Sequence, residues 1–444
     1  MRRILPWNKW YSARSYFNSS LWIVPFFAIL LNMVVSRLTQ PIDSWLVQSG
    51  RLDKTSGLLA LSMPGARTLL ETIITLNVSF TVFTFGSLLV AIQVASGQMT
   101  PRIIATTLLR DNAIRYAVGF FVFTMLFALR ALDQMEQSVH QFVTFIAQIL
   151  GALSLVTFLY LIDYAARMLR PVSVVQRITT LGLKVIKDVF PNPTVGPPPA
   201  TTRIAALSPR RTVCHEGNSG IVLAVNLEAL VAHAHQLDGI IAFVPQVGDF
   251  VAVDEPLFRL YGGAENIDDR ELRANVAFGT ERTIEQDPTF AFRILVDIAL
   301  KALSPAINDP TTATLAIDGL HRLLLAVGKK HLHGEEIIDR MGNFRAVLRT
   351  SNWDDFVHLT FTEIRHFGGG SIQIARRLRS MIAVLIQTLP EHRHQALCNE
   401  LHLLDLTFEQ HFPFPEDLAL ARTPDPQGLG SSRKTEEKAL CPVL

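Results

Sequence analysis

The chain has 444 residues, of which 49% are hydrophobic and 18% are charged, and its formal net charge is +2. Soluble domains carry about 25% charged residues, so this composition argues against a disordered chain and against a nucleic-acid-binding surface. Residues 1–165 hold 12 Lys or Arg against 7 Asp or Glu, whereas the remainder holds 29 against 32. An apolar, weakly basic half therefore precedes a more conventional half.

Four windows without charged residues dominate the first half. They run over residues 15–36, 72–101, 116–129 and 137–162. A helix needs about 20 mostly apolar residues to cross ~30 Å of hydrocarbon. The third window is short, and it spans only if Arg115 and Arg130 extend towards the headgroups. We expect an α-helical integral membrane domain with four transmembrane helices over residues 1–165, in contact with membrane lipid.

The distribution of Lys and Arg predicts the orientation, because short cytoplasmic loops are rich in basic residues. The N-terminus, the loop after the second window and the stretch after the fourth window are basic, whereas the loop after the third window has only Arg130 at its edge. Basic residues in the first loop weaken this contrast. We expect a multi-pass protein with both termini cytoplasmic. A three-span alternative leaves the third window as a re-entrant segment and the C-terminal half outside.

Residues 166–200 form a connector with two parts. Residues 172–190 have an amphipathic helical pattern, with an apolar stripe through Val174, Ile178, Leu181, Val185 and Val189. This helix either rests on an anionic membrane surface or is buried against the next domain. The run PNPTVGPPPA at 191–200 is typical of a stiff linker.

The second half is predicted to be an α+β region on the cytoplasmic side. Short apolar runs bounded by turn residues predict a small β module over 201–265. It resembles biotinyl and lipoyl carrier modules, but no lysine occurs between Lys187 and Lys301 for covalent attachment. Helical patterns predict a helical domain over 266–424. The tail, 425–444, is rich in Pro, Gly, Ser and charge, and we expect it to be disordered.

Two sets of residues in the first half are candidate functional residues. Asn77, Thr81, Thr84 and Ser87 recur at helical spacing in the second window. Such a stripe either lines a water-filled path or allows close helix packing. Arg102, Arg110 and Asp111 form either a charged cluster at a pore mouth or a loop anchored by its charges.

Metal, cofactor and enzyme signatures are not found in the sequence. Three His-X-His pairs have no acidic or cysteine pattern to complete a ligand set, and no phosphate-binding loop, nucleophile elbow or dinucleotide fingerprint occurs. We expect no metal, no cofactor and no enzymatic activity. The glycine run before Ser371, with Arg376 and Arg377 nearby, is a weak candidate for binding an anion.

Two long stretches, 83–132 and 290–324, resemble a bacterial family of predicted membrane proteins, domain of unknown function 2254. The resemblance extends from about residue 21 to about residue 404. It implies a location in the bacterial inner membrane and implies no activity. It also directs attention to motif residues of unknown role: Pro101, Arg102, Arg110, Asp111, Asp297, Ser304, Pro305, Asn308, Asp309, Pro310 and Thr312.

The leading hypothesis is an oligomeric channel- or transport-like protein, expected to be a homo-oligomer, with a cytoplasmic regulatory domain. The alternative is a membrane-anchored sensor or scaffold whose cytoplasmic domain binds a small anion or a protein.

Overall fold

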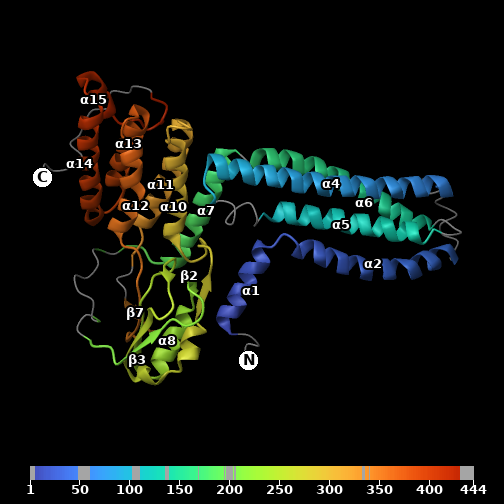
Figure 1. Cartoon of the computed structure of the whole chain (residues 1–444), viewed down its shortest axis with the longest axis horizontal. Helices are drawn as coiled ribbons and strands as arrows, with labels where there is room; N and C mark the ends of the chain where they lie inside the picture. Colours follow the sequence, from blue (N-terminus) through green and yellow to red (C-terminus); the bar gives the residue numbers. More distant parts are fainter. Residues whose placement is uncertain are drawn as a thin grey trace. The chain divides into compact units, whose positions relative to one another are not determined.

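The structure, a computed structural model, describes residues 6–48, 61–102, 111–135, 140–168, 170–194, 196, 204, 207–332, 336–339 and 341–430. The chain divides into two compact units (Figure 1). One, here called the apolar unit, comprises residues 17–97 and 103–173. The other, here called the mixed unit, comprises residues 1–16, 98–102 and 174–444.

The apolar unit contains the helices α2 (Ile23–Gln48), α4 (Met63–Gln98), α5 (Asn112–Asp133) and α6 (Gln141–Met168). Among the described residues, three helices are long and apolar enough to cross a membrane: α4, α5 and α6. The apolar part of α2, Ile23–Thr39, is shorter. The third window, short in the sequence, lies within a helix of 22 residues, which is long enough to span. Three of the four expected spans therefore have a suitable helix, and the crossing by α2 stays a prediction.

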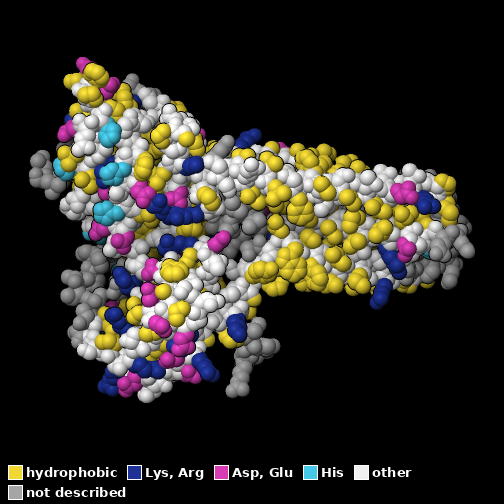
Figure 2. Space-filling view, viewed as in Figure 1, with side chains coloured by type: hydrophobic (Ala, Val, Ile, Leu, Met, Phe, Trp, Pro, Cys, Tyr) yellow, Lys and Arg dark blue, Asp and Glu magenta, His cyan; other side chains and the backbone are white. Residues whose placement is uncertain are grey.

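Large apolar side chains point outward from the apolar unit (Figure 2). Val82 and Leu89 of α4 are each 67% exposed, and Val156 of α6 is 63% exposed. In water such a surface is unfavourable, whereas hydrocarbon tails solvate it. Inside the unit, the helices approach closely at glycines: a side chain at Gly119 would overlap Val24, and one at Gly151 would overlap Ile73. The unit therefore has the properties of a membrane-embedded helix bundle.

The mixed unit contains two β-sheets. The first has the strand order β1 (Arg211–Cys214), β5 (Pro256–Gly262), β3 (Gly239–Phe243), β8 (Phe344–Leu348) and β7 (Glu336–Ile338). The second has the order β4 (Phe250–Val251), β2 (Gly220–Val225) and β6 (Val276–Gly279). β3 and β8 are parallel, with Ile241 opposite Ala346, and the other pairs are antiparallel. The β structure thus extends beyond the expected 201–265, because three strands come from later in the chain.

The helices of the mixed unit include α8 (Leu227–Gln236) and α9 (Asp269–Arg273) beside the sheets. The larger helical part contains α10 (Pro288–Ala302), α11 (Pro310–Gly328), α12 (Trp353–Gly368), α13 (Ile372–Thr388), α14 (His394–His411) and α15 (Pro415–Ala421). Figure 1 shows this bundle apart from the sheets. The expected α+β character of the second half is confirmed.

The amphipathic connector forms α7 (Pro171–Val189). Its residues Val174, Ile178 and Val185 are buried. A side chain at Gly182 would overlap Ala291 of α10 and Leu323 of α11, so this face of α7 packs on the helical part of the mixed unit. Of the two interpretations of the apolar stripe, burial against the next domain is therefore correct, and adsorption on a membrane surface is not, because the stripe is already covered.

Two further segments belong to the mixed unit although they were expected in the membrane domain 1–165. The first is the start of α1 (Trp7–Ser19), where Trp7 and Tyr11 pack against Leu223, and the backbone N–H of Asn8 donates to the carbonyl oxygen of Ala274 (3.0 Å). The second is the segment 98–102 that follows α4. Both segments belong to the mixed unit because of contacts with residues far away in the sequence. The composition of a segment does not reveal such contacts.

The first residues of the expected disordered tail, 425–430, are ordered in the structure. The side chain of Arg376 in α13 is fully buried, and it donates to the carbonyl oxygens of Thr423 (3.0 Å) and Gly430 (2.9 Å). Asp425 is buried and accepts a hydrogen bond from the N–H of Gly430 (2.6 Å). Residues 425–430 are therefore packed on α13, and the rest of the expected tail, 431–444, lies outside the described residues.

Candidate functional site

The predicted polar stripe of α4 lies partly inside the apolar unit. Asn77 and Thr84 are buried, whereas Thr81 and Ser87 are half-buried. The hydroxyl groups of Thr81, Thr84 and Ser87 donate to carbonyl oxygens of α4 itself, at 2.8, 2.7 and 2.9 Å. The Nδ2 atom of Asn77 likewise donates to the carbonyl oxygen of Ile73 (2.8 Å). Of these four residues, Asn77 keeps an unused polar atom, its Oδ1.

Several polar side chains are buried in this unit, and three of them combine almost complete burial with an atom that has no hydrogen-bond partner in the described part of the chain. These three are Asn77 of α4, Thr124 of α5 and Ser154 of α6, and each is at most 1% exposed. Within the described part of the chain, Asn77 Oδ1, Thr124 Oγ1 and Ser154 Oγ have no hydrogen-bond partner. We call these three residues the polar layer.

Contacts between the helices place the polar layer at one level of the bundle. Gly151 of α6 lies against Ile73 of α4, and the ring of Phe158 stacks on Phe80 with centroids 4.1 Å apart. Phe121 of α5 also contacts Phe80, at 5.6 Å between centroids. Each member of the polar layer lies within about one helical turn of these contacts on its own helix. No spacing in the sequence combines the three, although Thr124 and Ser154 are polar residues inside apolar windows.

The polar layer separates two hydrophobic clusters of the apolar unit. The cluster on one side includes Leu70, Ile73, Phe127, Ala128 and Ala147. The cluster on the other side includes Phe80, Leu88, Ile114, Phe121 and Leu161. The second cluster lies towards the end of α4 that precedes segment 98–102. The rings of Phe80, Phe121 and Phe158, here called the aromatic plug, lie on that side of the polar layer, where Phe121 and Phe158 each pack against Phe80.

The predicted charged loop is divided by the structure. Arg110 lies outside the described residues. Asp111 is buried and is the N-cap of α5, where it accepts a hydrogen bond from the N–H of Ala113 (2.9 Å). It also accepts a hydrogen bond from the hydroxyl group of Tyr164 in α6 (2.5 Å). Asp111 therefore joins α5 to α6 within the apolar unit, which is a structural role.

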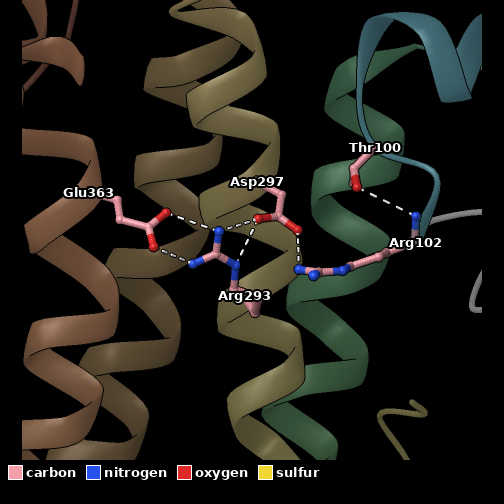
Figure 3. Close-up of polar contacts among 5 residues, drawn as sticks. All are labelled: Thr100, Arg102, Arg293, Asp297 and Glu363. Atoms are coloured by element: carbon pink, nitrogen blue, oxygen red, sulfur yellow. Dashed lines mark hydrogen bonds and ion pairs between the residues drawn. The ribbon is translucent and has the colours of Figure 1, made fainter. Parts of the chain in front are cut away.

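Arg102 instead joins a charged network in the mixed unit (Figure 3). Its Nη1 atom lies 2.5 Å from Oδ2 of Asp297 in α10. The other carboxylate oxygen of Asp297 accepts a hydrogen bond from Nε of Arg293 (2.7 Å). Arg293 also binds both carboxylate oxygens of Glu363 in α12, at 2.7 and 2.9 Å. Two family-motif residues, Arg102 and Asp297, thus meet across 195 positions of sequence.

In this network the positive charge of Arg293 and the negative charge of Glu363 stabilise each other. The hydrogen bonds from Arg293 hold the pKa of the Glu363 carboxyl below its ordinary value. The hydrogen bonds to Glu363 raise the pKa of Arg293. Both groups stay ionised near neutral pH. The network ties the segment that follows α4 to α10 and α12. Arg293 and Glu363 were missed by sequence reasoning, because ordinary charged residues on amphipathic helices carry no distinguishing pattern.

The remaining motif residues shape the turn between α10 and α11. Asp309 is the N-cap of α11, and its carboxylate accepts hydrogen bonds from the N–H (3.1 Å) and hydroxyl group (2.5 Å) of Thr312. The hydroxyl hydrogen bond holds the pKa of Asp309 below its ordinary value. Pro310 occupies the first helical turn, where its missing N–H costs nothing. Asn308, in the turn before α11, adopts a left-handed backbone conformation with a φ of +48°. At the end of α10, the hydroxyl group of Ser304 donates to the carbonyl oxygen of Lys301 (2.7 Å). Helix capping accounts for all of these contacts.

Arg376 and Arg377, which were considered for anion binding together with the glycine run before Ser371, instead bind groups of the protein itself. Arg377 binds Asp318 (2.6 Å) and, like Arg376, donates to a backbone carbonyl oxygen near the end of the described chain. The guanidinium groups of Arg376 and Arg377 are therefore engaged in these contacts rather than directed at an anion at the start of α13. In the described part of the chain, no group of three or more His, Cys, Asp or Glu side chains is arranged to hold a metal ion.

A cavity of about 430 Å³ lies in the mixed unit, between the sheets and the helical part. Its lining includes the start of α10, the end of α7 and the segment after β8. Asp287, the N-cap of α10, is 2% exposed, and burial raises the pKa of its carboxyl. The cavity was not foreseen, because it is lined by segments far apart in the sequence.

Comparisons with known proteins agree with these features. A family described as "Predicted membrane protein (DUF2254)" matches residues 18–384. The uncharacterized proteins MT1328 and Rv1290c of two Mycobacterium tuberculosis strains, and Mb1321c of Mycobacterium bovis, are each 23% identical to the chain over 429 residues. The similarity covers 91% of this chain and 79% of each relative. No solved structure matches the chain significantly.

Proposed function

This chain belongs to the DUF2254 family of predicted membrane proteins, and we propose that it is an oligomeric channel- or transport-like protein of the bacterial inner membrane. Its path passes through the apolar unit, and the mixed unit is a cytoplasmic regulatory domain.

The observation that carries this proposal is the polar layer. A buried hydroxyl or amide group without a partner costs about 1–3 kcal/mol, so three such groups are expensive in a bundle that serves only as an anchor. Leucine or alanine would pack there without that cost. Water or a permeating polar solute satisfies these oxygen atoms when it enters the bundle.

The aromatic plug supports a gated path. Apolar constrictions close pores by excluding water, and the rings of Phe80, Phe121 and Phe158 fill the interior beside the polar layer. In the proposed path, this packing of the rings corresponds to the closed state. Opening requires these rings to separate, which a shift of α4 against α5 and α6 would produce.

Chain connectivity supports four crossings and a common side for both termini. The chain leaves the mixed unit after residue 16, returns at 98–102, leaves again and returns at 174. Each excursion begins and ends in the mixed unit, so each makes an even number of crossings, and the described residues of each supply two helices, α2 with α4 and α5 with α6. The basic residues Arg14, Arg102 and Arg170 flank these transitions, which favours the cytoplasmic side for the mixed unit.

The network at Asp297 gives the regulatory domain a connection to the path. Arg102 follows α4, the helix that contributes Asn77 and Phe80. A movement of α10 or α12 that breaks the Arg102–Asp297 contact releases the end of α4.

The exposed side of α4 offers a surface for the homo-oligomer. Apart from the local backbone of α4 and the adjacent residues, no described atom lies within 4 Å of the position that a Cβ would take at Gly86 or Gly97. Small residues allow membrane helices to approach closely, so a second copy of the chain fits against this face.

The proposal is tested by ion flux into liposomes that contain the purified full-length protein. The Phe80→Ala variant, which opens the plug, should raise flux at least tenfold. Adding Asn77→Leu to it should remove the increase. Val82→Ala is the matched control, because Val82 is two residues away and points outward. Equal flux in all folded variants contradicts the path.

A second candidate function is a membrane-anchored sensor, which the cavity in the mixed unit favours. A sensor binds its ligand without flux through the apolar unit, so it predicts no effect of Phe80→Ala on any ion.

A further inference from the structure

The helix α1 has two sides with different surroundings. On one side, Trp7 and Tyr11 pack against the mixed unit, and the hydroxyl group of Tyr11 donates to a carboxylate oxygen of Glu285. Helical spacing places the other exposed residues of α1 on the opposite side. That side, here called the outer face, consists of five exposed residues: Lys9, Trp10, Ala13, Tyr16 and Phe17.

The outer face is rich in exposed aromatic side chains. Trp10, Tyr16 and Phe17 are 43%, 56% and 50% exposed. Apolar side chains that gather on an exposed surface mark an interaction site. Trp and Tyr are enriched at the level of membrane headgroups, because each has an apolar ring and a polar group that stays hydrated. The outer face therefore fits the boundary between water and hydrocarbon.

The charge around the outer face is positive. Lys9 belongs to the face, and the guanidinium group of Arg14 lies 5.3 Å from the centroid of the Trp10 ring. Residues 1–42 contain five Lys or Arg and no Asp or Glu. The carboxylate of Glu285 contacts α1 through Tyr11, on the opposite side of the helix. Basic residues beside a membrane attract anionic headgroups, so the charge of this face complements an anionic lipid surface.

Chain connectivity keeps the outer face close to the membrane. α1 ends at Ser19 and α2 begins at Ile23, and an extended chain covers at most about 14 Å between these two residues. In addition, Nη2 of Arg115 in α5 donates to the carbonyl oxygen of Phe17 (2.8 Å). The end of α1 is thus fixed to helices of the apolar unit, where lipid is the partner that is always present.

We propose that the outer face of α1 binds anionic phospholipids, with Lys9 and Arg14 at the phosphate groups and the aromatic side chains among the headgroups. The surface differs from that of α7, whose apolar stripe is covered, because the outer face is exposed. Through its other side, α1 joins the bound lipid to the mixed unit. The proximity to lipid rests on the proposed function, in which α2 crosses the membrane, whereas the exposure and charge of the face do not.

The test is quenching of tryptophan fluorescence in the full-length protein, reconstituted into lipid nanodiscs. The nanodiscs contain phosphatidylglycerol or phosphatidylcholine with bromine atoms on the acyl chains near the headgroup, at equal fractions. The contribution of Trp10 is the quenching that Trp10→Phe removes. Phosphatidylglycerol should quench Trp10 at least about twofold more strongly than phosphatidylcholine, because its negative charge is attracted to Lys9 and Arg14. The Lys9→Gln/Arg14→Gln double variant should lose this preference.

Two control variants match these changes. Arg322→Gln/Lys329→Gln removes the same charge from exposed positions of α11 and its C-cap, and it should keep the preference for phosphatidylglycerol. Trp7→Phe changes a tryptophan on the side of α1 that packs against the mixed unit. It should therefore remove far less lipid quenching than Trp10→Phe does.

Three results overturn the proposal. They are the absence of lipid quenching at Trp10, equal quenching of Trp10 by the two lipids, and a preference that survives the loss of Lys9 and Arg14. These three positions are exposed, so their variants should fold.

Trp22, which directly precedes α2, separates this outcome from the proposed function. Lipid quenching removed by Trp22→Phe reports the entry of α2 into the membrane. Quenching of Trp22 without quenching of Trp10 excludes the lipid surface of α1 and keeps the crossing by α2. The readout is fluorescence rather than flux, so absent flux with an intact lipid preference contradicts the path and keeps the lipid surface.

Discussion

The contact between Arg102 and Asp297 makes a quantitative prediction, because it joins the segment after α4 to α10. The distance is 2.5 Å, and the two side chains are 48% and 15% exposed. Exposed ion pairs contribute about 0.2–1 kcal/mol, whereas hydrogen bonds to charged groups contribute about 1.5–3 kcal/mol. With one partner half-exposed, we expect a coupling free energy of about 1 kcal/mol.

The single substitutions should differ in cost. Arg102→Gln removes one contact of Asp297, and Arg293 remains to compensate the carboxylate. Asp297→Asn removes the charge that both arginines use, although Arg293 keeps Glu363. We therefore expect about 0.5–1 kcal/mol for Arg102→Gln and about 1–2 kcal/mol for Asp297→Asn.

The measurement is a double-mutant cycle on thermal unfolding of the full-length protein in detergent. A loss of 1 kcal/mol lowers Tm by about 2–4 °C in a folding unit of 150–250 residues, and by less in a larger one. The double variant should be about 1 kcal/mol more stable than the sum of the single losses implies. Additivity within about 0.3–0.5 kcal/mol would refute the contact. Arg102→Gln combined with Lys301→Gln is the control and should be additive, because Lys301 lies one turn beyond Asp297 and is exposed.

Two further predictions concern the helical part of the mixed unit. Burial lowers the pKa of His321 in α11, so the unfolded chain takes up its proton first, and stability should fall as pH drops from about 7 to about 5, through the ordinary His pKa of ~6.5. Thermal unfolding across that range should show a shallower dependence in His321→Gln, and an unchanged dependence contradicts the assignment. Gly182→Leu should destabilise the protein by about 1–3 kcal/mol, because its Cβ would lie 2.8 Å from Ala291. In denaturant unfolding, Thr180→Leu on the exposed side of α7 should cost little, and equal losses in the two variants would contradict the packing of α7.

Local features of this protein followed from its sequence. Charge-free windows predicted helices α4, α5 and α6, because a long apolar run without charges favours a membrane helix. The Asp309-Pro310 pair predicted the start of α11, since the N-cap side chain and the first helical residue act within one turn. The stripe on residues 172–190 predicted α7 for the same reason, although its partner was left open.

Distant contacts were decided only by the tertiary structure. Strand β8 pairs in parallel with β3 although about a hundred residues separate them. Arg102 meets Asp297, and Asn77 shares a layer with Thr124 and Ser154, without any common spacing in the chain. Helix periodicity and capping depend on residues a few positions apart, and a sequence displays them directly. Which faces then meet depends on the packing of whole elements, in which many individually small contacts compete. That is why the sequence predicted the membrane helices, whereas the polar layer, the charged network and the cavity emerged from the fold.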